Sequence, residues 1–348
     1  MSRSRTTKAN DSPPAAALPS LTERRLKAAL TSQKKENRQL EAAWLRAEQR
    51  MEELLAAVVL VTPVKFQSTP GDSRKKKNVR VVLSLADWQI GMKVLADEIQ
   101  GYNEYSLRVA RRRLTTMCDK LDHWLGQHAQ VYNILEIVVL GLGDLLEGTL
   151  RLESCMFVEF PPPTQAIHAG YLLAEVLNRL SAWGPVRYEG LNSDNHARLF
   201  KKPMSQGRGV WSYNPVLHAM ATAATQSNAR ITVNAHNPIK VDVRVGNHIF
   251  LIEHGNDIYT WMGIPAYGIE RAAAREARRR AEAGLPPFNY YVFGHWHQRW
   301  VSENVMIMPA LCGTTPYDHS KGRRGIPGQH VCLVDQRHGI FDELRMDL

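Results

Sequence analysis

Four apolar segments that end abruptly in polar residues constrain this fold more than any other feature of the sequence. The segments are VVLSLAD, IVVLGLGD, IFLIEHG and YYVFGHWH. Near-continuous apolar runs of this length are typical of strands that are buried on both faces, as in sheets covered by helices. The polar residues at their ends are Asp87 with Gln89, Asp144, His254, and His295 with His297.

Helix-forming segments alternate with these strands at residues 105–127, 165–183 and 269–283. Alternation of this kind predicts an α/β body that begins near residue 79. Toward the end of the chain, VSENVMIMPAL and HVCLVDQRHGIFDELRM are more typical of antiparallel strands. We therefore expect one α/β domain over residues 79–348.

The first 78 residues differ in composition and predict three further segments. Residues 1–19 are polar and contain three prolines, which is typical of a disordered tail. Ser20-Leu21-Thr22-Glu23 fits a capping box, and no Gly or Pro follows before Pro63, so we expect a helix over residues 20–62. Residues 63–78 include STPGDSRKKK and are expected to form a linker.

The expected helix has an imperfect heptad pattern, which leaves two alternatives open. It forms a coiled coil with another copy, or it packs as one long helix against the body. We favour the coiled coil, and thus a homodimer or higher oligomer formed through residues 20–60. The two core positions of the heptad would be Leu30, Asn37, Trp44, Met51 and Val58, and Leu26, Gln33, Leu40, Ala47 and Leu54.

The positive charge of the chain is concentrated in the same N-terminal region. Residues 1–80 contain 17 Lys+Arg and 8 Asp+Glu, whereas the remaining residues contain 27 and 26. A basic arm suits a polyanionic partner such as nucleic acid, because each phosphate contact releases counterions. The alternative is a solvated, soluble tail without a partner.

The sequence points away from membranes and from disulfide scaffolds. The longest apolar run near the N-terminus, Leu54–Val64, is about half as long as a membrane-spanning helix. The first residues lack the apolar core of a signal peptide. The 4 Cys show no close pairing, so reduced thiols are expected. We expect a cytoplasmic protein, in a bacterial cytosol or a phage-infected host, with no membrane partner.

The strand-end residues predict a metal site. Ligand sites in open α/β sheets form at the carboxyl ends of the strands, where these residues would meet. Carboxylates, imidazoles and amide oxygens are the ligands that Mn²⁺, Fe and Zn²⁺ prefer. Asn195 and His196 in GLNSDNHAR add an amide and an imidazole between the second and third strands. A single strand-end Asp or His is usually a turn residue, but this series predicts a shared site.

In this order, the residues resemble the motifs of the calcineurin-like metallophosphoesterases, which run D-x-H, G-D-x-x-D/E, G-N-H-D/E, a single H, and G-H-x-H. The resemblance covers residues 79–333, about three quarters of the chain. The sequence departs from the pattern at Gln89, where the family has His, and at Asp194, where it usually has Gly. The closest matches are Gly143-Asp144 with Glu147, and Gly294-His295-Trp296-His297.

The resemblance implies a two-sheet β-sandwich flanked by helices that holds two divalent metal ions. We expect Mn²⁺ first, with Fe, Zn²⁺ or Ni²⁺ as alternatives. A metal-bridging hydroxide would attack the phosphate in line while His196, which is not a ligand, assists the leaving group. The implied ligands are Asp87, Gln89, Asp144 and His297 for one metal, and Asp144, Asn195, His254 and His295 for the other.

Three substrate classes remain open. The body is similar to the phage and prophage branch related to DNA repair exonucleases in its DWQIG, GDLLEG and GTTPYDHSKGRRGIPGQ segments. Together with the basic arm, this similarity favours a DNA nuclease. The alternatives are a small-molecule phosphoesterase for nucleotides or cyclic nucleotides, and a metal-bound DNA-binding protein whose catalysis is weakened by Gln89. The candidate substrate-binding residues are Arg198, Lys321, Arg323 and Arg324.

Overall fold

The computed structural model describes residues 21–59, 76–260 and 265–348. The chain divides into two compact units, residues 1–50 and 51–348. Helix α1 (Leu21–Val59) occupies the segment in which the sequence predicts a helix. The predicted tail and residues 63–75 of the predicted linker lie outside the described residues, and the predicted body begins with β1 (Lys77–Leu85).

Large apolar side chains of α1 are exposed in the single chain. Leu30, Leu40, Trp44 and Leu45 are each about half exposed, and the first three are predicted core positions of the heptad. The coiled coil remains a prediction.

No helix in the described ranges is both long and apolar enough to cross a membrane.

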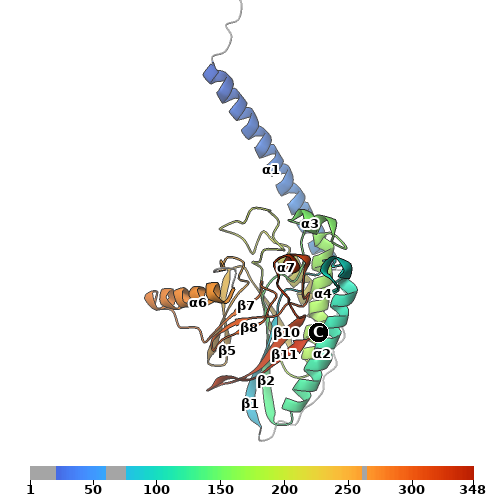
Figure 1. Cartoon of the computed structure of the whole chain (residues 1–348), viewed down its shortest axis with the longest axis vertical. Coiled ribbons are helices and arrows are strands. Elements are labelled where there is room, and N and C mark those ends of the chain that lie inside the picture. The colour runs from blue at the N-terminus through green and yellow to red at the C-terminus, as the bar shows by residue number, and fades with distance from the viewer. Residues whose placement is uncertain (1–20, 60–75, 261–264) are drawn as a thin grey trace, which may run out of the picture. The chain divides into compact units, whose positions relative to one another are not determined.

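The second unit alternates strands with helices over most of its length (Figure 1). The first half contains β1, a 3-10 helix (Ala96–Ile99), α2 (Leu107–His128), β2 (Tyr132–Gly141), α3 (Leu152–Met156), α4 (Pro162–Leu180), β3 (Val186–Leu191), α5 (Asn214–Thr225) and β4 (Ile231–His236). The second half contains β5 (Lys240–Val245), β6 (His248–Glu253), α6 (Pro265–Glu282), β7 (Tyr290–Phe293), β8 (Trp300–Val301), β9 (Val305–Ile307), α7 (Pro316–Ser320), β10 (Gly328–Asp335) and β11 (Gly339–Asp347).

Within the described residues, the strands form two sheets. The first has the order β11-β10-β1-β2-β3-β4, in which β1 to β4 are parallel and β10 and β11 are antiparallel. The second has the order β5-β6-β7-β9-β8, in which β6, β7 and β9 are parallel. Parallel neighbours place their carboxyl ends at the same edge of a sheet, and this is the edge where the predicted site residues lie.

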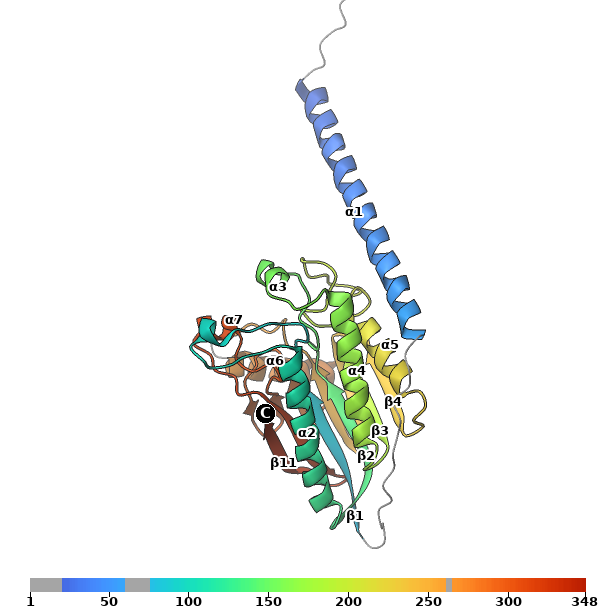
Figure 2. The same cartoon turned by 90° about the vertical axis from the view of Figure 1, so that its right-hand side faces the viewer.

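Alternating side chains of β1 fill two separate cores. Val81 and Leu83 pack with apolar residues of α2 and α4, which lie with α5 over one face of the first sheet (Figure 2). Val82 faces the other way and packs against Phe250 and Val292 of the second sheet. A third core joins the far face of the second sheet to Ile269 of α6. The second unit is therefore a two-sheet sandwich with helices on both outer faces, as the family resemblance implied.

The structure contains elements that the apolar runs did not predict. Strands β4 and β5 alternate between more and less buried positions, so polar residues interrupt their apolar pattern. Helix α5 begins at Asn214-Pro215 and is rich in Ala, which gives a weak signal. The expectation for residues 301–311 was partly wrong, because β9 pairs with β7 in parallel and only the short β8 is antiparallel to it.

Buried His218 on α5 makes folding sensitive to acid. Its Nδ1 lies 2.7 Å from Asn192 Oδ1 and its Nε2 lies 3.1 Å from the Tyr188 hydroxyl, so a neutral ring satisfies both contacts. Burial, with a smaller effect of the charge on His236, lowers the pKa of His218 to about 3. Because the unfolded chain takes up this proton near pH 6.5 and the folded chain does not, protonation of His218 leaves stability unchanged above that pH and opposes folding increasingly below it.

We therefore expect the free energy of unfolding to fall below pH 6.5 by up to about 1.4 kcal/mol per pH unit from this group. Urea unfolding at pH 7.5, 5.5 and 4.5 measures the slope. His218→Gln keeps a side chain of similar polarity that does not titrate, and it should reduce the slope. If the free energy of unfolding fell equally steeply with pH in the wild type and in His218→Gln, the acid sensitivity would arise from other groups.

Candidate metal centre

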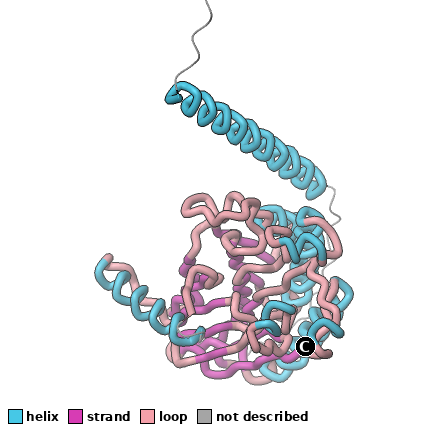
Figure 3. Tube along the Cα trace, turned by 45° about the horizontal axis from the view of Figure 1, so that its top comes forward, coloured by secondary structure: helices cyan, strands magenta, loops and turns pink. Residues whose placement is uncertain are grey.

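Every predicted metal-site residue lies in the loop that follows a strand. The strands of the body, magenta in Figure 3, are joined by pink loops, and the site residues lie on such loops. Three of the strands belong to the first sheet and two to the second, so the site lies where the edges of both sheets meet. Asp87 follows β1, Asp144 follows β2, Asn195 and His196 follow β3, His254 follows β6, and His295 and His297 follow β7.

The backbone at this site adopts a conformation that non-glycine residues rarely take. Among the described residues, six non-glycine residues have a positive φ, and only Gln100 lies outside the predicted ligands. Such conformations cost free energy and tend to cluster at functional sites, where they aim side chains. The other five are Asp87, Gln89, Asp144, His295 and His297, with φ between 45° and 74°.

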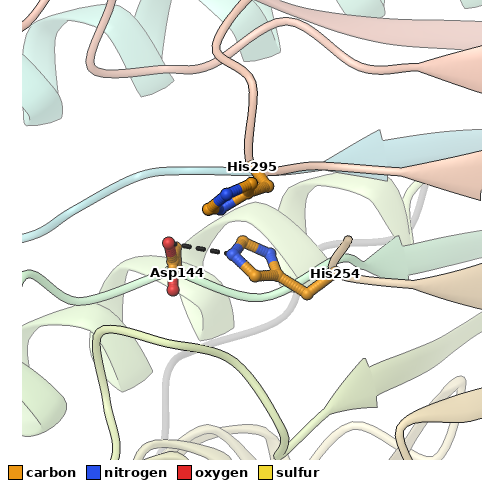
Figure 4. Close-up of side chains that lie close together, drawn as sticks. All are labelled: Asp144, His254 and His295. Atoms are coloured by element: carbon orange, nitrogen blue, oxygen red, sulfur yellow. Dashed lines mark ion pairs between the residues drawn. The ribbon is translucent and has the colours of Figure 1, made fainter. Parts of the chain in front are cut away.

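Asp144, His254 and His295 form the tightest cluster. One ligand atom from each of these side chains lies within 4.8 Å of the others, and the three point toward one another (Figure 4). Asp144 Oδ2 and Asn195 Oδ1 each lie 2.9 Å from His254 Nε2. Carboxylate, imidazole and amide groups at this spacing can hold a divalent metal ion.

The hydrogen bonds of His254 leave one nitrogen facing two oxygens. Its Nδ1 lies 2.8 Å from the carbonyl oxygen of Leu142 and donates to it, so in the neutral ring Nε2 carries a lone pair. That lone pair faces Asp144 Oδ2 and Asn195 Oδ1, an arrangement that requires a proton or a cation among them. Burial lowers the pKa of His254, but the charge of Asp144 outweighs it and raises the pKa to about 10.

A second cluster contains Asp87, Gln89 and His297. His297 Nε2 lies 3.6 Å from Asp87 Oδ1 and 3.3 Å from Gln89 Nε2. His297 Nδ1 donates to Asp318 Oδ2 at 2.7 Å, which orients the ring and leaves Nε2 toward the cluster. Burial raises the pKa of Asp87 to about 6, although the positive charges of His297 and His254 counteract part of this effect.

The two clusters carry negative charge that the described protein does not neutralise with Lys or Arg. Asp87 and Asp144 are fully buried from solvent. Within the described residues, both carboxylates form ion pairs with histidines and not with Lys or Arg. Gln89 Oε1 is also buried and has no hydrogen-bond partner in the ranges that the structure covers. A buried charge or acceptor is costly without compensation, so the donor set fits bound cations.

His196 lies beside this donor set with one nitrogen fixed and one free to reach the cavity. Its Nδ1 lies 2.8 Å from the carbonyl oxygen of Glu147 and donates to it. Its Nε2 lies 3.7 Å from Asp144 Oδ2, and the side chain lines the cavity. Burial lowers the pKa of His196, but Asp144 and Glu147 more than compensate and raise it to about 10.

Two acidic residues that the sequence did not assign to the site position its members. Asp194 accepts hydrogen bonds from the backbone N–H groups of Asp144 at 2.9 Å and Ala197 at 2.8 Å, so it locks the loop that carries His196. Asp318 orients His297 and closes a capping box with Thr315. The Thr315-x-x-Asp318 pattern is a signal of a helix cap that the sequence contains. No sequence signal pointed to the role of Asp194, which stood out only because the family usually has Gly at that position.

A cavity of about 510 Å³ opens above these residues. Gln89, Asp144, Asn195, His196, His295 and His297 line it, together with basic Lys93, Arg151 and Arg323. Of the predicted substrate-binding residues, only Arg323 is among the described lining residues. Arg198 borders a small neighbouring pocket, and Lys321 and Arg324 lie against the rings of Tyr317 and Tyr102. Trp296 lines the cavity, whereas Trp88 is fully buried.

No protein-family model and no curated protein matches this chain. One solved structure with a similar fold is Vps29 of Entamoeba histolytica in complex with zinc. The two sequences are 10% identical, the TM-score is 0.34, and the match covers 77% of this chain and 98% of that chain. Vacuolar Protein Sorting 29 of Cryptosporidium parvum is 12% identical, with a TM-score of 0.29 and coverages of 78% and 98%.

A protein of Streptococcus pneumoniae described as a predicted phosphoesterase is also similar to this chain. It is 9% identical with a TM-score of 0.23, and the match covers 77% of this chain and 98% of that protein. All three TM-scores lie below 0.5.

Proposed function

We propose that this chain is a divalent-metal-dependent phosphodiesterase that acts on nucleic acid. The observation that carries the proposal is the pair of buried carboxylates, Asp87 and Asp144, with imidazoles around them and an amide oxygen that has no partner among the described residues. Asp144 lines the cavity together with Gln89 and three of the histidines. Apart from Gln89, the same residues follow the order of the metallophosphoesterase motifs. Basic side chains around the same cavity suit a phosphate ester as substrate.

The residues present would hold two metal ions. When bound, such a pair polarises the phosphate and activates water near neutral pH. Mn²⁺ is the metal that we would test first. Asp87, Gln89, Asp144 and His297 would hold one ion, and Asp144, Asn195, His254 and His295 the other.

His196 has the geometry of a proton donor to the leaving group. Its Nδ1 is fixed on the Glu147 carbonyl oxygen, so the proton that it exchanges is carried on Nε2. As the bond between phosphorus and the leaving oxygen breaks, Nε2–H donates its proton to that oxygen. The attacking oxygen comes from water, so the products are a phosphate monoester and an alcohol.

Basic side chains line the cavity beside its acidic ones, and they would contact a polyanionic substrate. Lys93, Arg151 and Arg323 line the cavity and would bind the non-bridging phosphate oxygens or flanking phosphates. A small nucleotide substrate is the second candidate, since the cavity volume of about 510 Å³ is sufficient for a nucleotide.

The test is to incubate the protein with linear single-stranded DNA, double-stranded DNA, cyclic nucleotides and a generic phosphodiester, each with Mn²⁺ or with a chelator. Metal-dependent cleavage of DNA supports the proposal, and product lengths separate endonuclease from exonuclease action. Hydrolysis of cyclic nucleotides with intact DNA would favour the second candidate. Binding of DNA with no hydrolysis of any substrate would favour an inactive binding protein.

The contact between Asp318 and His297 yields a prediction about metal affinity. Asp318→Asn removes the charged acceptor of the 2.7 Å hydrogen bond from His297 Nδ1, so the imidazole becomes a weaker and less well oriented ligand. We expect a roughly 10- to 100-fold loss of metal affinity, with partial recovery of the rate at high Mn²⁺. Titration of activity against Mn²⁺ measures this, and an unchanged midpoint would show that Asp318 serves only the cap of α7.

The basic arm yields a prediction about DNA binding. Deleting residues 1–78 removes most of the net positive charge, so we expect weaker DNA binding and a shallower dependence of log Kd on log salt. Fluorescence anisotropy at several salt concentrations measures both quantities. Hydrolysis of a generic phosphodiester is the control. An unchanged salt slope would mean that the arm does not contact DNA, and sedimentation of both proteins tests the predicted coiled-coil association.

A further inference from the structure

A second cavity, of about 500 Å³, lies along helix α6, the orange helix beside the second sheet in Figure 1. Its described walls include Lys240, Arg271, Arg275 and Arg279. The sequence alone suggested that the arginines of α6 form a solvated face with neighbouring glutamates. The structure instead directs some of them into a concave surface.

The charge of this cavity is positive. The acidic residues among its described walls are Asp257 and Glu276. Glu276 is already paired with Lys240 at 2.8 Å and with Arg279 at 2.7 Å, and Asp257 is paired with Arg208. Four basic and two acidic side chains are among the described walls, so the cavity has an excess of positive charge that favours an anionic ligand.

The basic cavity adjoins the candidate metal centre. Ile258, Tyr259 and Thr260 line both cavities, so a three-residue wall separates them. Tyr259 on this wall is 92% exposed, which is unusual for so large an aromatic side chain. Proteins bind single-stranded nucleic acids with a basic groove that holds the backbone and aromatic rings on which the bases stack. Here an exposed aromatic ring lies between two cavities that are both lined by basic side chains.

We propose that the α6 cavity is a subsite for the backbone of single-stranded nucleic acid, adjacent to the scissile phosphate, with Tyr259 stacking on a base at the boundary. The inference rests on the proposed function and adds to it a substrate class, a strand longer than one nucleotide. A single strand is favoured over a duplex because the bases of a duplex are already stacked on each other.

Charge reversal at Arg275 tests the backbone contact. Arg275→Glu should weaken the binding of a fluorescent 20-nucleotide single strand about tenfold and lower its salt slope by about one. The matched control is Arg278→Glu on the same helix, because Arg278 is 82% exposed, pairs with Glu282 and is not among the lining residues that the structure describes. Equal effects of the two variants would overturn the subsite in favour of long-range charge.

Substitution of Tyr259 tests the stacking contact. Tyr259→Ala should weaken single-strand binding about 5- to 100-fold, whereas Tyr259→Phe, which keeps the ring, should retain it. Equal losses in the two variants, or no loss in either, would overturn the stacking role.

Two readouts keep this inference separate from the proposed function. Anisotropy in the presence of a chelator measures binding without turnover, so the subsite is tested even if the protein hydrolyses nothing. With Mn²⁺, the ratio of kcat/KM for the single strand to that for bis(4-nitrophenyl) phosphate should fall about tenfold in Arg275→Glu. Wild-type binding with no hydrolysis would contradict the phosphodiesterase alone, and a variant ratio equal to wild type would contradict the subsite alone.

Discussion

Asp144→Asn is expected to reduce hydrolysis of every phosphodiester substrate by at least about a thousandfold. Asp144 contacts two other members of the site, because its carboxylate lies 2.9 Å from His254 Nε2 and 3.7 Å from His196 Nε2 and accepts the His196 backbone N–H. The asparagine has nearly the same shape. It has no charge, however, and can present an N–H group to His254 instead of an oxygen.

The same substitution should abolish the response of the protein to metal. A ligand that binds only the folded state stabilises it by about 2.7 kcal/mol at a concentration of 100 times its Kd. Mn²⁺ should therefore raise the Tm of the wild-type protein but not that of Asp144→Asn. The comparison is made between the Tm with and without Mn²⁺ for each protein, so a difference in stability between the metal-free proteins does not affect it.

Asp342→Asn is the control for this experiment. It makes the same chemical change at a half-exposed carboxylate on β11, whose partner is His128 and which is not among the described residues of the cavity. Its rate and its Mn²⁺ response should match those of the wild type. A wild-type rate in Asp144→Asn, or a Tm that still rises with Mn²⁺, would overturn the assignment of the metal centre.

The strand ends were predictable because burial on both faces leaves little freedom in sequence. β1 and β2 must be apolar where they pass between the helices and the second sheet, and they can become polar only beyond the carboxyl edge. The first polar residues after them, such as Asp87 and Asp144, therefore mark the site. The residues of the donor set follow from this rule and from the order of the motifs.

The supporting contacts were not predictable, because they connect segments that are distant in the sequence. Asp318 lies 21 residues after His297 and meets it only through the turn into α7. Lys93 and Arg151 reach the cavity from loops without regular secondary structure, and nothing in their local sequence distinguishes them from other surface cations. The basic cavity along α6 likewise depends on how the helix packs and not on its composition.

Gly148→Ala is expected to lower activity about a hundredfold while the sandwich remains folded. Gly148 has φ of +69°, which strains any residue with a side chain. In addition, a Cβ atom at this position would lie 2.0 Å from the carbonyl oxygen of His196. The backbone of His196 must therefore move by about 1 Å, and a displacement of that size misplaces the proton donor.

Gly284→Ala separates the collision from the strain. Gly284 has φ of +67°, and no described atom lies within 4 Å of the position of its Cβ. It should lose about 1–2 kcal/mol of stability from backbone strain and keep its activity. Gly148→Ala should lose about 1–3 kcal/mol more, because of the overlap.

Urea unfolding measures the stability of the two glycine variants, and kcat/KM for a generic phosphodiester measures their activity. Metal binding by Gly148→Ala should stay close to wild type, because the collision falls on the carbonyl group of His196, which is not a ligand in the proposed set. If activity and metal affinity fell together, the displacement would extend to Asn195 and Asp144. If activity were unchanged, the position of His196 would not limit the reaction, and the leaving oxygen would take its proton from another group.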